Sequence, residues 1–128
     1  MCGTFSFPRS HRLRSRRDFS RVFEMRVRAA DGPLIVFASP TDLSHCRLGI
    51  VIGRPVGCAV RRNRIKRCLR EAFRLNQASL TGRYDFVAVV RPHDPAVQMP
   101  WGRMLLGLMR TLDARWQRRQ ADGNSTGT

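Results

Sequence analysis

The sequence of 128 residues has little acidic charge to balance its basic side chains. Nine Asp and Glu residues stand against 24 Lys and Arg residues, which gives a formal net charge of +15. Such a charge favours an anionic partner, either a nucleic acid or an anionic membrane surface. Lysine is nearly absent too, because Lys66 is the only one. Arginine makes bidentate contacts with phosphate and stacks on bases, so nucleic acid is the favoured partner.

Long apolar runs and paired cysteines are also missing. No stretch approaches the roughly 18 apolar residues of a membrane-spanning helix, and the N-terminus lacks the basic-then-apolar order of a signal peptide. The cysteines have no CxxC pairing and no zinc-finger spacing; they are Cys2, Cys46, Cys58 and Cys68. We therefore expect reduced, partly buried thiols in a cytoplasmic protein that has no membrane partner and no metal ligands of its own.

The usual catalytic motifs are absent as well. The sequence contains neither GxGxxG nor a P-loop, and its carboxylates form no DxD or ExxE pair. The three histidines, His11, His45 and His93, lie in separate segments with no local motif to join them. Binding is therefore favoured over catalysis. Three other functions stay open on composition alone: a general or ribosomal RNA-binding module, a self-sufficient nuclease and a DNA-binding regulator.

Residues 56–75, VGCAVRRNRIKRCLREAFRL, are the most informative stretch. Seven of the twenty residues are basic, and a helix would turn by about 100° at each residue. One arc is then apolar and consists of Ile65, Cys68, Leu69, Ala72 and Phe73. The opposite arc is polar and mostly basic, with Asn63, Lys66, Arg67, Arg70 and Arg74. One face of this helix suits a hydrophobic core and the other suits an anionic partner.

The rest of the chain reads as one domain between two polar ends. Residues 1–14 form a basic arm, residues 15–120 the domain and residues 121–128 a flexible polar tail. Around the central helix, we predict helices at 15–28 and 101–119 and strands at 34–39, 46–53 and 84–91. The first two strands are expected to pair as an antiparallel hairpin, and the third has the continuous apolar run of a central strand. This order predicts an α+β fold, a two-layer α/β sandwich with a mixed sheet.

The segment AVRRNRIKRCLREAFR, residues 59–74, resembles the signature of the protein subunit of bacterial ribonuclease P. Three further segments resemble the same family: FPRSHRLRSRRDFSRVF, RLGIVIGRPVG and YDFVAVVRPHDPA. The resemblance extends from about Phe5 to Leu112. It implies a left-handed βαβ crossover, as in the second domain of ribosomal protein S5, whereas general rules predict a right-handed one.

The resemblance also implies a function. The family's holoenzyme removes the 5′ leader of precursor tRNA, and its catalyst is a large RNA with bound Mg²⁺. The protein would then be an accessory subunit without catalytic residues, without dedicated Mg²⁺ ligands and without an obligate protein partner. Its partners would be the catalytic RNA subunit and precursor tRNA.

By position, the resemblance assigns two groups of residues. Those expected to contact the RNA subunit are Arg62, Asn63, Arg64, Lys66, Arg67 and Arg70. Those expected to line a cleft for the leader are Arg12, Arg14, Phe19, Phe23 and Phe37. Without the resemblance, helical spacing would make Phe19 and Phe23 core residues. The chain departs from the family at three places: Arg54-Pro55 stands where two lysines are common, Phe37 replaces a tyrosine, and Cys58 replaces a better helix cap.

Overall fold

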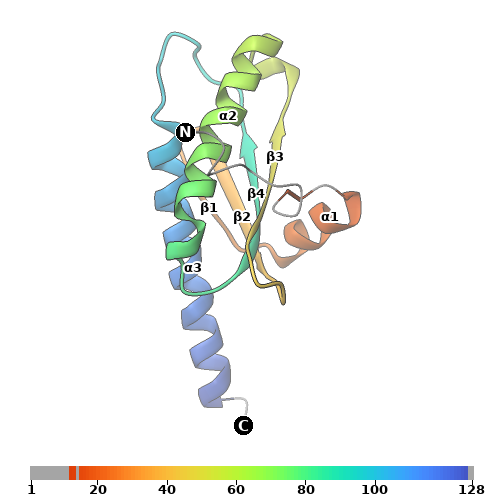
Figure 1. The fold of residues 1–128 in the computed structure, drawn as a ribbon, viewed down its shortest axis with the longest axis vertical. Coiled ribbons are helices and arrows are strands. Elements are labelled where there is room, and N and C mark those ends of the chain that lie inside the picture. The colour runs from red at the N-terminus through yellow and green to blue at the C-terminus, as the bar shows by residue number, and fades with distance from the viewer. Residues whose placement is uncertain (1–11, 14, 127–128) are drawn as a thin grey trace.

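The protein is described by a computed structural model that covers residues 12–13 and 15–126. Predictions for Cys2, His11, Arg14 and most of the basic arm therefore lie outside the described residues. Three α-helices and four strands follow one another along the described residues (Figure 1). They are α1 (Arg16–Met25), β1 (Arg28–Asp31), β2 (Leu34–Pro40), β3 (Arg47–Ile52), α2 (Ala59–Asn76), β4 (Tyr84–Val90) and α3 (Trp101–Thr126).

The four strands form one mixed sheet in the order β1-β2-β4-β3. β2 is antiparallel to both β1 and β4, and β3 is parallel to β4. The predicted hairpin between residues 34–39 and 46–53 is wrong, because β4 lies between these strands. The fully buried residues of β4, such as Phe86, Val87 and Ala88, lose more water-exposed apolar surface in the centre of the sheet than they would at an edge.

The chain crosses from β3 to β4 through α2. When the sheet is viewed from the α2 side with both strands pointing up, β4 lies to the left of β3 (Figure 1). This crossover is left-handed, against the general preference for right-handed connections. The predicted α+β class, mixed sheet and left-handed crossover are confirmed.

Helices cover both faces of the sheet, to different extents. α2 and α3 pack together on one face over alternate residues of β2 and β4, and they enclose the main hydrophobic core. α1 lies on the other face over β2 and β4. There Val22 and Leu13 are buried with Val87, and this second cluster is much smaller than the first.

Two helix boundaries differ from the prediction. α1 ends at Met25 instead of Arg28, because Arg26 takes a left-handed conformation with φ 59° and its N–H bonds to the carbonyl of Phe23. The chain then forms β1 and turns back at Gly32, whose φ of +58° suits a residue without a side chain. At the other end, the backbone of α3 continues to Thr126, into the segment predicted as a flexible tail.

Candidate nucleic-acid interface

The buried side of α2 agrees with the predicted apolar arc except at one residue. Ile65, Leu69, Ala72 and Phe73 are buried, whereas Cys68 is exposed. Cys68 lies at the margin of the arc, where α2 borders an open cavity that it lines together with Arg64. The expectation of partly buried thiols is therefore wrong for Cys68.

The other two described cysteines also differ from each other. Cys58 is exposed at the start of α2, so the expectation of a partly buried thiol is wrong there too. Its side chain makes no capping hydrogen bond, as its replacement of a better cap predicts. Cys46 is completely buried. Burial raises the pKa of the Cys46 thiol, although the Tyr84 N–H donates to its Sγ at 3.4 Å and opposes this shift.

The six α2 residues predicted to contact an RNA subunit lie in four different places around the helix. Asn63 and Arg67 are exposed on the outside of the helix. Arg64 lies on the side of the 91–100 loop, while Lys66 and Arg70 are half-buried on the side of β3. The Arg62 side chain points toward the N-terminus of α2, where its Nε–H donates to the carbonyl of Gly57 at 3.1 Å.

Arg61 has a different role from its basic neighbours. Its guanidinium donates to the carbonyl of Pro95 at 3.2 Å and lies 2.9 Å from Nε2 of His93. Nδ1 of His93 lies 2.9 Å from the carbonyl of Arg91, which only accepts, so Nδ1 carries the proton and Nε2 accepts from Arg61. Arg61 and His93 thus attach the 91–100 loop to α2, a link between distant segments that no local motif indicates.

On the α1 side of the sheet, the strand register aligns side chains in rows. One row contains Arg28, Phe37, Val87 and Gly49, from four neighbouring strands. α1 places Phe19 and Phe23 on this row. The rings of Phe23 and Phe37 meet edge to face at 4.8 Å between centroids. A methyl carbon added to Gly49 would lie 2.5 Å from Cζ of Phe19, so that ring lies directly on the glycine.

Phe19, Phe23 and Phe37 together form what we call the aromatic patch. All three are half-buried, so each packs on the small α1-side core and keeps part of its ring accessible. The three phenylalanines assigned to leader binding are therefore brought together. Arg28 adds a cation 5.9 Å from the centre of the Phe37 ring.

The next row along the same face is less covered. It contains Ile35, Val89 and Val51, which lie side by side in register on β2, β4 and β3. Ile35 and Val89 are half-buried, and Val51 is 40% exposed. We call these three residues the open row. The apolar surface thus continues beyond the aromatic patch. Sequence reasoning missed this extension, although the alternation of β2 would have indicated it once the strand pairing was known.

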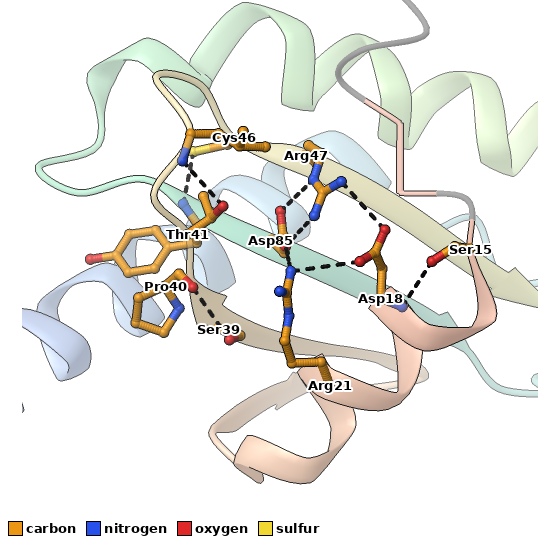
Figure 2. Close-up of polar contacts among 11 residues, drawn as sticks. Ser15, Asp18, Arg21, Ser39, Pro40, Thr41, Cys46, Arg47 and Asp85 are labelled. Atoms are coloured by element: carbon orange, nitrogen blue, oxygen red, sulfur yellow. Dashed lines mark hydrogen bonds and ion pairs between the residues drawn. The ribbon is translucent and has the colours of Figure 1, made fainter.

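On the other side of the aromatic patch, a third row carries an ion cluster centred on Asp85, which is completely buried. Arg47 donates to both carboxylate oxygens of Asp85, at 2.8 and 2.6 Å, and Arg21 donates at 2.9 Å. Figure 2 shows the two arginines reaching Asp85 from β3 and from α1, with Asp18 beside them. Hydrogen bonding to Asp85 is the main reason that the pKa of Arg47 is raised. This cluster fixes α1 to the sheet.

A side-chain hydrogen bond fixes the start of α1. Ser15 is the N-cap, and its Oγ accepts a hydrogen bond from the Asp18 N–H at 3.0 Å. The Asp18 carboxylate accepts a hydrogen bond from Nη1 of Arg47 at 3.4 Å. The cap and the ion cluster together fix the first turn of α1, and this positions Phe19 over the sheet.

Arg12 lies beside α2 and not among the phenylalanines. It pairs with Leu48 at the outer edge of β3, and the next N–H, from Leu13, donates to the Leu48 carbonyl at 3.0 Å. Arg12 lines a cavity together with Lys66 and Arg70. Its assignment to leader binding stays a prediction.

Residues 12–13 and 15–126 contain neither a cluster of metal ligands nor a helix fit to cross a membrane. No three His, Cys, Asp or Glu side chains come close enough together to hold a metal ion. None of the helices in this part of the chain combines the length and the apolar character that a membrane crossing requires.

The arrangement of a mixed four-stranded sheet with three helices matches solved structures. The ribonuclease P protein from Thermotoga maritima superposes with a TM-score of 0.69 and 34% identity, covering 77% of this chain and 97% of that one. The family model described as Ribonuclease P matches residues 7–113.

Sequence relatives agree with the structural match. The ribonuclease P protein component of Methylococcus capsulatus is 43% identical over 113 residues, which is 88% of this chain and 83% of its own length. That of Chromobacterium violaceum is 49% identical over 84 residues, 65% of this chain and 69% of its own length. The chain belongs to the ribonuclease P protein family.

Proposed function

We propose that this protein is the RNA-binding accessory subunit of a bacterial ribonuclease P, with two surfaces for two RNA segments. The basic outside of α2 would bind the catalytic RNA subunit. The aromatic patch on the opposite side of the sheet would bind the single-stranded 5′ leader of precursor tRNA. The observation that carries the proposal is this separation: three half-exposed phenylalanines lie together on one face of the sheet, while the helix with seven basic residues in 56–75 covers the other.

Aromatic rings suit a single-stranded leader because every base has a face that can stack on them. Such stacking contributes about 1–3 kcal/mol per base and tolerates many sequences. Phe19 and Phe23 come from α1 and Phe37 from β2, so the rings present more than one surface. Ile35, Val89 and Val51 extend the apolar floor, and Arg28 offers a nearby cation for a phosphate.

The α2 surface suits structured RNA because it offers several cations on a rigid helix. Arginine fixes phosphate by paired hydrogen bonds, and Asn63 can bond a ribose hydroxyl or a base. If about eight phosphates are neutralised, the logarithm of affinity should fall with the logarithm of salt concentration at a slope of roughly −6 to −7. Catalysis is assigned to the RNA and its Mg²⁺. The protein would lower phosphate repulsion and hold the leader, which favours precursor over mature tRNA.

The decisive experiment is reconstitution with a bacterial ribonuclease P RNA at low Mg²⁺. We expect the protein to stimulate cleavage of precursor tRNA, and no stimulation would contradict the proposal. Phe19→Ala combined with Phe23→Ala should weaken binding of precursor about 10-fold or more while binding of mature tRNA changes little. Equal losses for the two substrates would mean that the rings serve only the core.

A matched pair of variants tests the α2 surface. Arg64→Ala combined with Arg67→Ala removes two cations whose side chains are exposed. Assembly with the catalytic RNA should weaken, and its salt slope should become shallower by about 1–2. The preference for precursor over mature tRNA, measured at saturating protein, should stay. A loss of preference instead of assembly would exchange the roles of the two surfaces.

A further inference from the structure

The aromatic patch reaches one side of the sheet at Arg28. This residue begins β1, which is an outer strand because the sheet has the order β1-β2-β4-β3. The Arg28 side chain is exposed, and its guanidinium lies 5.9 Å from the centre of the Phe37 ring. An RNA strand that leaves the aromatic patch past Phe37 would therefore meet Arg28 and then the outer edge of β1.

A second cation lies at this edge and comes from the opposite face of the sheet. The Val27 carbonyl accepts a hydrogen bond from the Ala38 N–H, so by the alternation of an antiparallel pair Arg28 points its backbone groups away from β2. Nη1 of Arg115, in α3, donates to the Arg28 carbonyl at 2.6 Å. Arg115 thus connects α3 to the strand on which the aromatic patch ends.

α3 continues the basic surface beyond the core. Leu108 and Leu112 belong to its buried side, and the same helical spacing next gives Arg115 and Arg119. Figure 1 shows the last turns of α3 extending beyond the sheet. The guanidinium of Arg119 lies 4.7 Å from the centre of the Trp116 ring, so this side chain too is held by a contact within the protein. Arginines therefore follow the apolar residues where the helix runs past the sheet.

The three arginines at this edge, Arg28, Arg115 and Arg119, are what we call the edge arginines. Among the described residues, none of them forms an ion pair with a carboxylate. Asp113 is the only carboxylate in residues 101–120, and it is buried and bound by Tyr84. A guanidinium has several N–H donors, so one internal contact leaves others for a phosphate. Because Arg115 and Arg119 are already held in place, binding would cost them little side-chain entropy.

We propose that the edge arginines bind phosphates of the distal part of a long 5′ leader, after the strand has left the aromatic patch around the outer edge of β1. The identity of the RNA as a leader rests on the proposed function. Arg115 and Arg119 both follow residue 113, where the match to the family model ends. Since phosphate contacts carry no sequence information, the site would make affinity depend on the length of the leader and not on its sequence.

The test uses the holoenzyme reconstituted with full-length protein and a series of precursor tRNAs whose leaders are shortened one nucleotide at a time. Arg115→Gln combined with Arg119→Gln should raise the Kd for precursors with long leaders about tenfold and leave the Kd for the shortest leaders unchanged. The salt dependence for long leaders should become shallower by about 1–1.5, because each phosphate contact to a single strand contributes roughly 0.7 to the slope.

Arg110→Gln combined with Arg118→Gln is the matched control. It removes the same charge from two other exposed positions of α3, at which the helical spacing does not continue the buried side. Its Kd should stay within about twofold of the unchanged protein at every leader length. Equal losses in the two double variants would overturn the site and indicate only diffuse charge. Equal losses of the edge variant for long and short leaders would also overturn it.

A separate variant keeps this site distinct from the proposed function. Phe19→Ala combined with Phe23→Ala should weaken binding of precursors with short and long leaders alike. If it leaves precursor binding unchanged, the leader role of the aromatic patch fails, and the length dependence of the edge variant still decides the edge site. In the unchanged protein, 4-thiouridine at a distal leader position should photo-cross-link to α3. Cross-links of that nucleotide to α2 alone would contradict the site.

Discussion

The two faces of the sheet are made from the same strands but are covered to different extents. On the α2–α3 face, alternate residues such as Leu34, Val36 and Phe86 are completely buried. The indole N–H of Trp116 on this face is also hydrogen-bonded, since Nε1–H donates to the Ala38 carbonyl at 3.1 Å. On the α1 face, three rows in register run from an ion cluster through half-exposed rings to the open row.

In the proposed function, this difference would separate the face that stabilises the fold from the face that binds RNA. A core of large, closely packed apolar side chains supplies most of the stability of a small domain. Once one face of the sheet supplies it, the other face can leave aromatic surface accessible and can fix its covering helix by ionic contacts. α1 is held on the sheet by the Asp85 cluster and by Val22, so Phe19 and Phe23 on the same helix do not need to be fully buried.

The largest expected effect comes from truncating the same residue type on each face. Phe86→Ala on the closed face should destabilise the protein by about 3–5 kcal/mol, because it opens a cavity next to Phe73 and Tyr84. Phe37→Ala on the α1 face should cost about 1–2 kcal/mol, since its ring is only half-buried. Urea unfolding measures both values. Equal costs would mean that the α1 face is a core like the other one.

Asp85→Asn should destabilise the protein by about 2–4 kcal/mol, because it leaves Arg47 and Arg21 without their shared buried carboxylate. Asp18→Asn is the control: the Asp18 side chain is more exposed and its contact with Arg47 is longer, so a cost of about 0–1 kcal/mol is expected. The ratio of precursor to mature tRNA affinity should also fall for Asp85→Asn, because α1 is released from the sheet. An unchanged ratio would show that the cluster does not position the rings.

Gly49→Ala tests whether the glycine positions the Phe19 ring. The added methyl would lie 2.5 Å from Cζ of Phe19, so the ring must move away from β3. We expect a stability cost of about 1–3 kcal/mol and weaker binding of precursor tRNA, with unchanged affinity for the catalytic RNA. Gly107→Ala is a matched control in α3, where nothing lies within 4 Å of an added methyl, and should stabilise the helix by about 0.5–1 kcal/mol. If the two variants bind precursor equally well, the ring is not positioned by Gly49.

The contrast between the two faces also explains what the sequence could predict. Ile65, Leu69, Ala72 and Phe73 follow a helical period within one segment, so the buried side of α2 was predictable from local spacing. The central place of β4 followed from its continuous apolar run. The left-handed crossover was expected only from the family resemblance, because local patterns do not encode the hand of a connection.

The features that sequence reasoning missed depend on contacts between distant segments. Arg21, Arg47 and Asp85 are separated by many residues, and each alone looks like an ordinary surface charge. β1 was missed because Ala29 and Ala30 favour no strand, and its existence depends on the turn at Gly32 that pairs it with β2. The open row became visible only when β4, and not β3, was found beside β2.

The smallest expected effect concerns Asp113, the buried aspartate of the closed face. Its carboxylate accepts hydrogen bonds from the Tyr84 hydroxyl at 2.5 Å and from the N–H groups of Thr81 and Gly82 at 2.8 and 3.2 Å. Burial raises the pKa of Asp113, but these three donors outweigh it and the pKa lies below its ordinary value of 3.8. Asp85 is bound by two cations, whereas Asp113 is bound by neutral donors alone among these contacts.

The lowered pKa fixes the direction of the pH dependence. The folded protein holds the Asp113 proton less tightly than the unfolded chain, so this contribution to stability is present above about pH 4 and is lost as pH falls through the folded pKa. Asp113→Asn should cost about 1 kcal/mol at pH 7 and should make the fall in unfolding free energy below about pH 4 shallower. Tyr84→Phe removes one donor and should give an intermediate slope in urea titrations at several pH values. If the unfolding free energy falls equally steeply below about pH 4 in the unchanged protein, Asp113→Asn and Tyr84→Phe, the donors of the closed face do not hold the Asp113 carboxylate in its charged form.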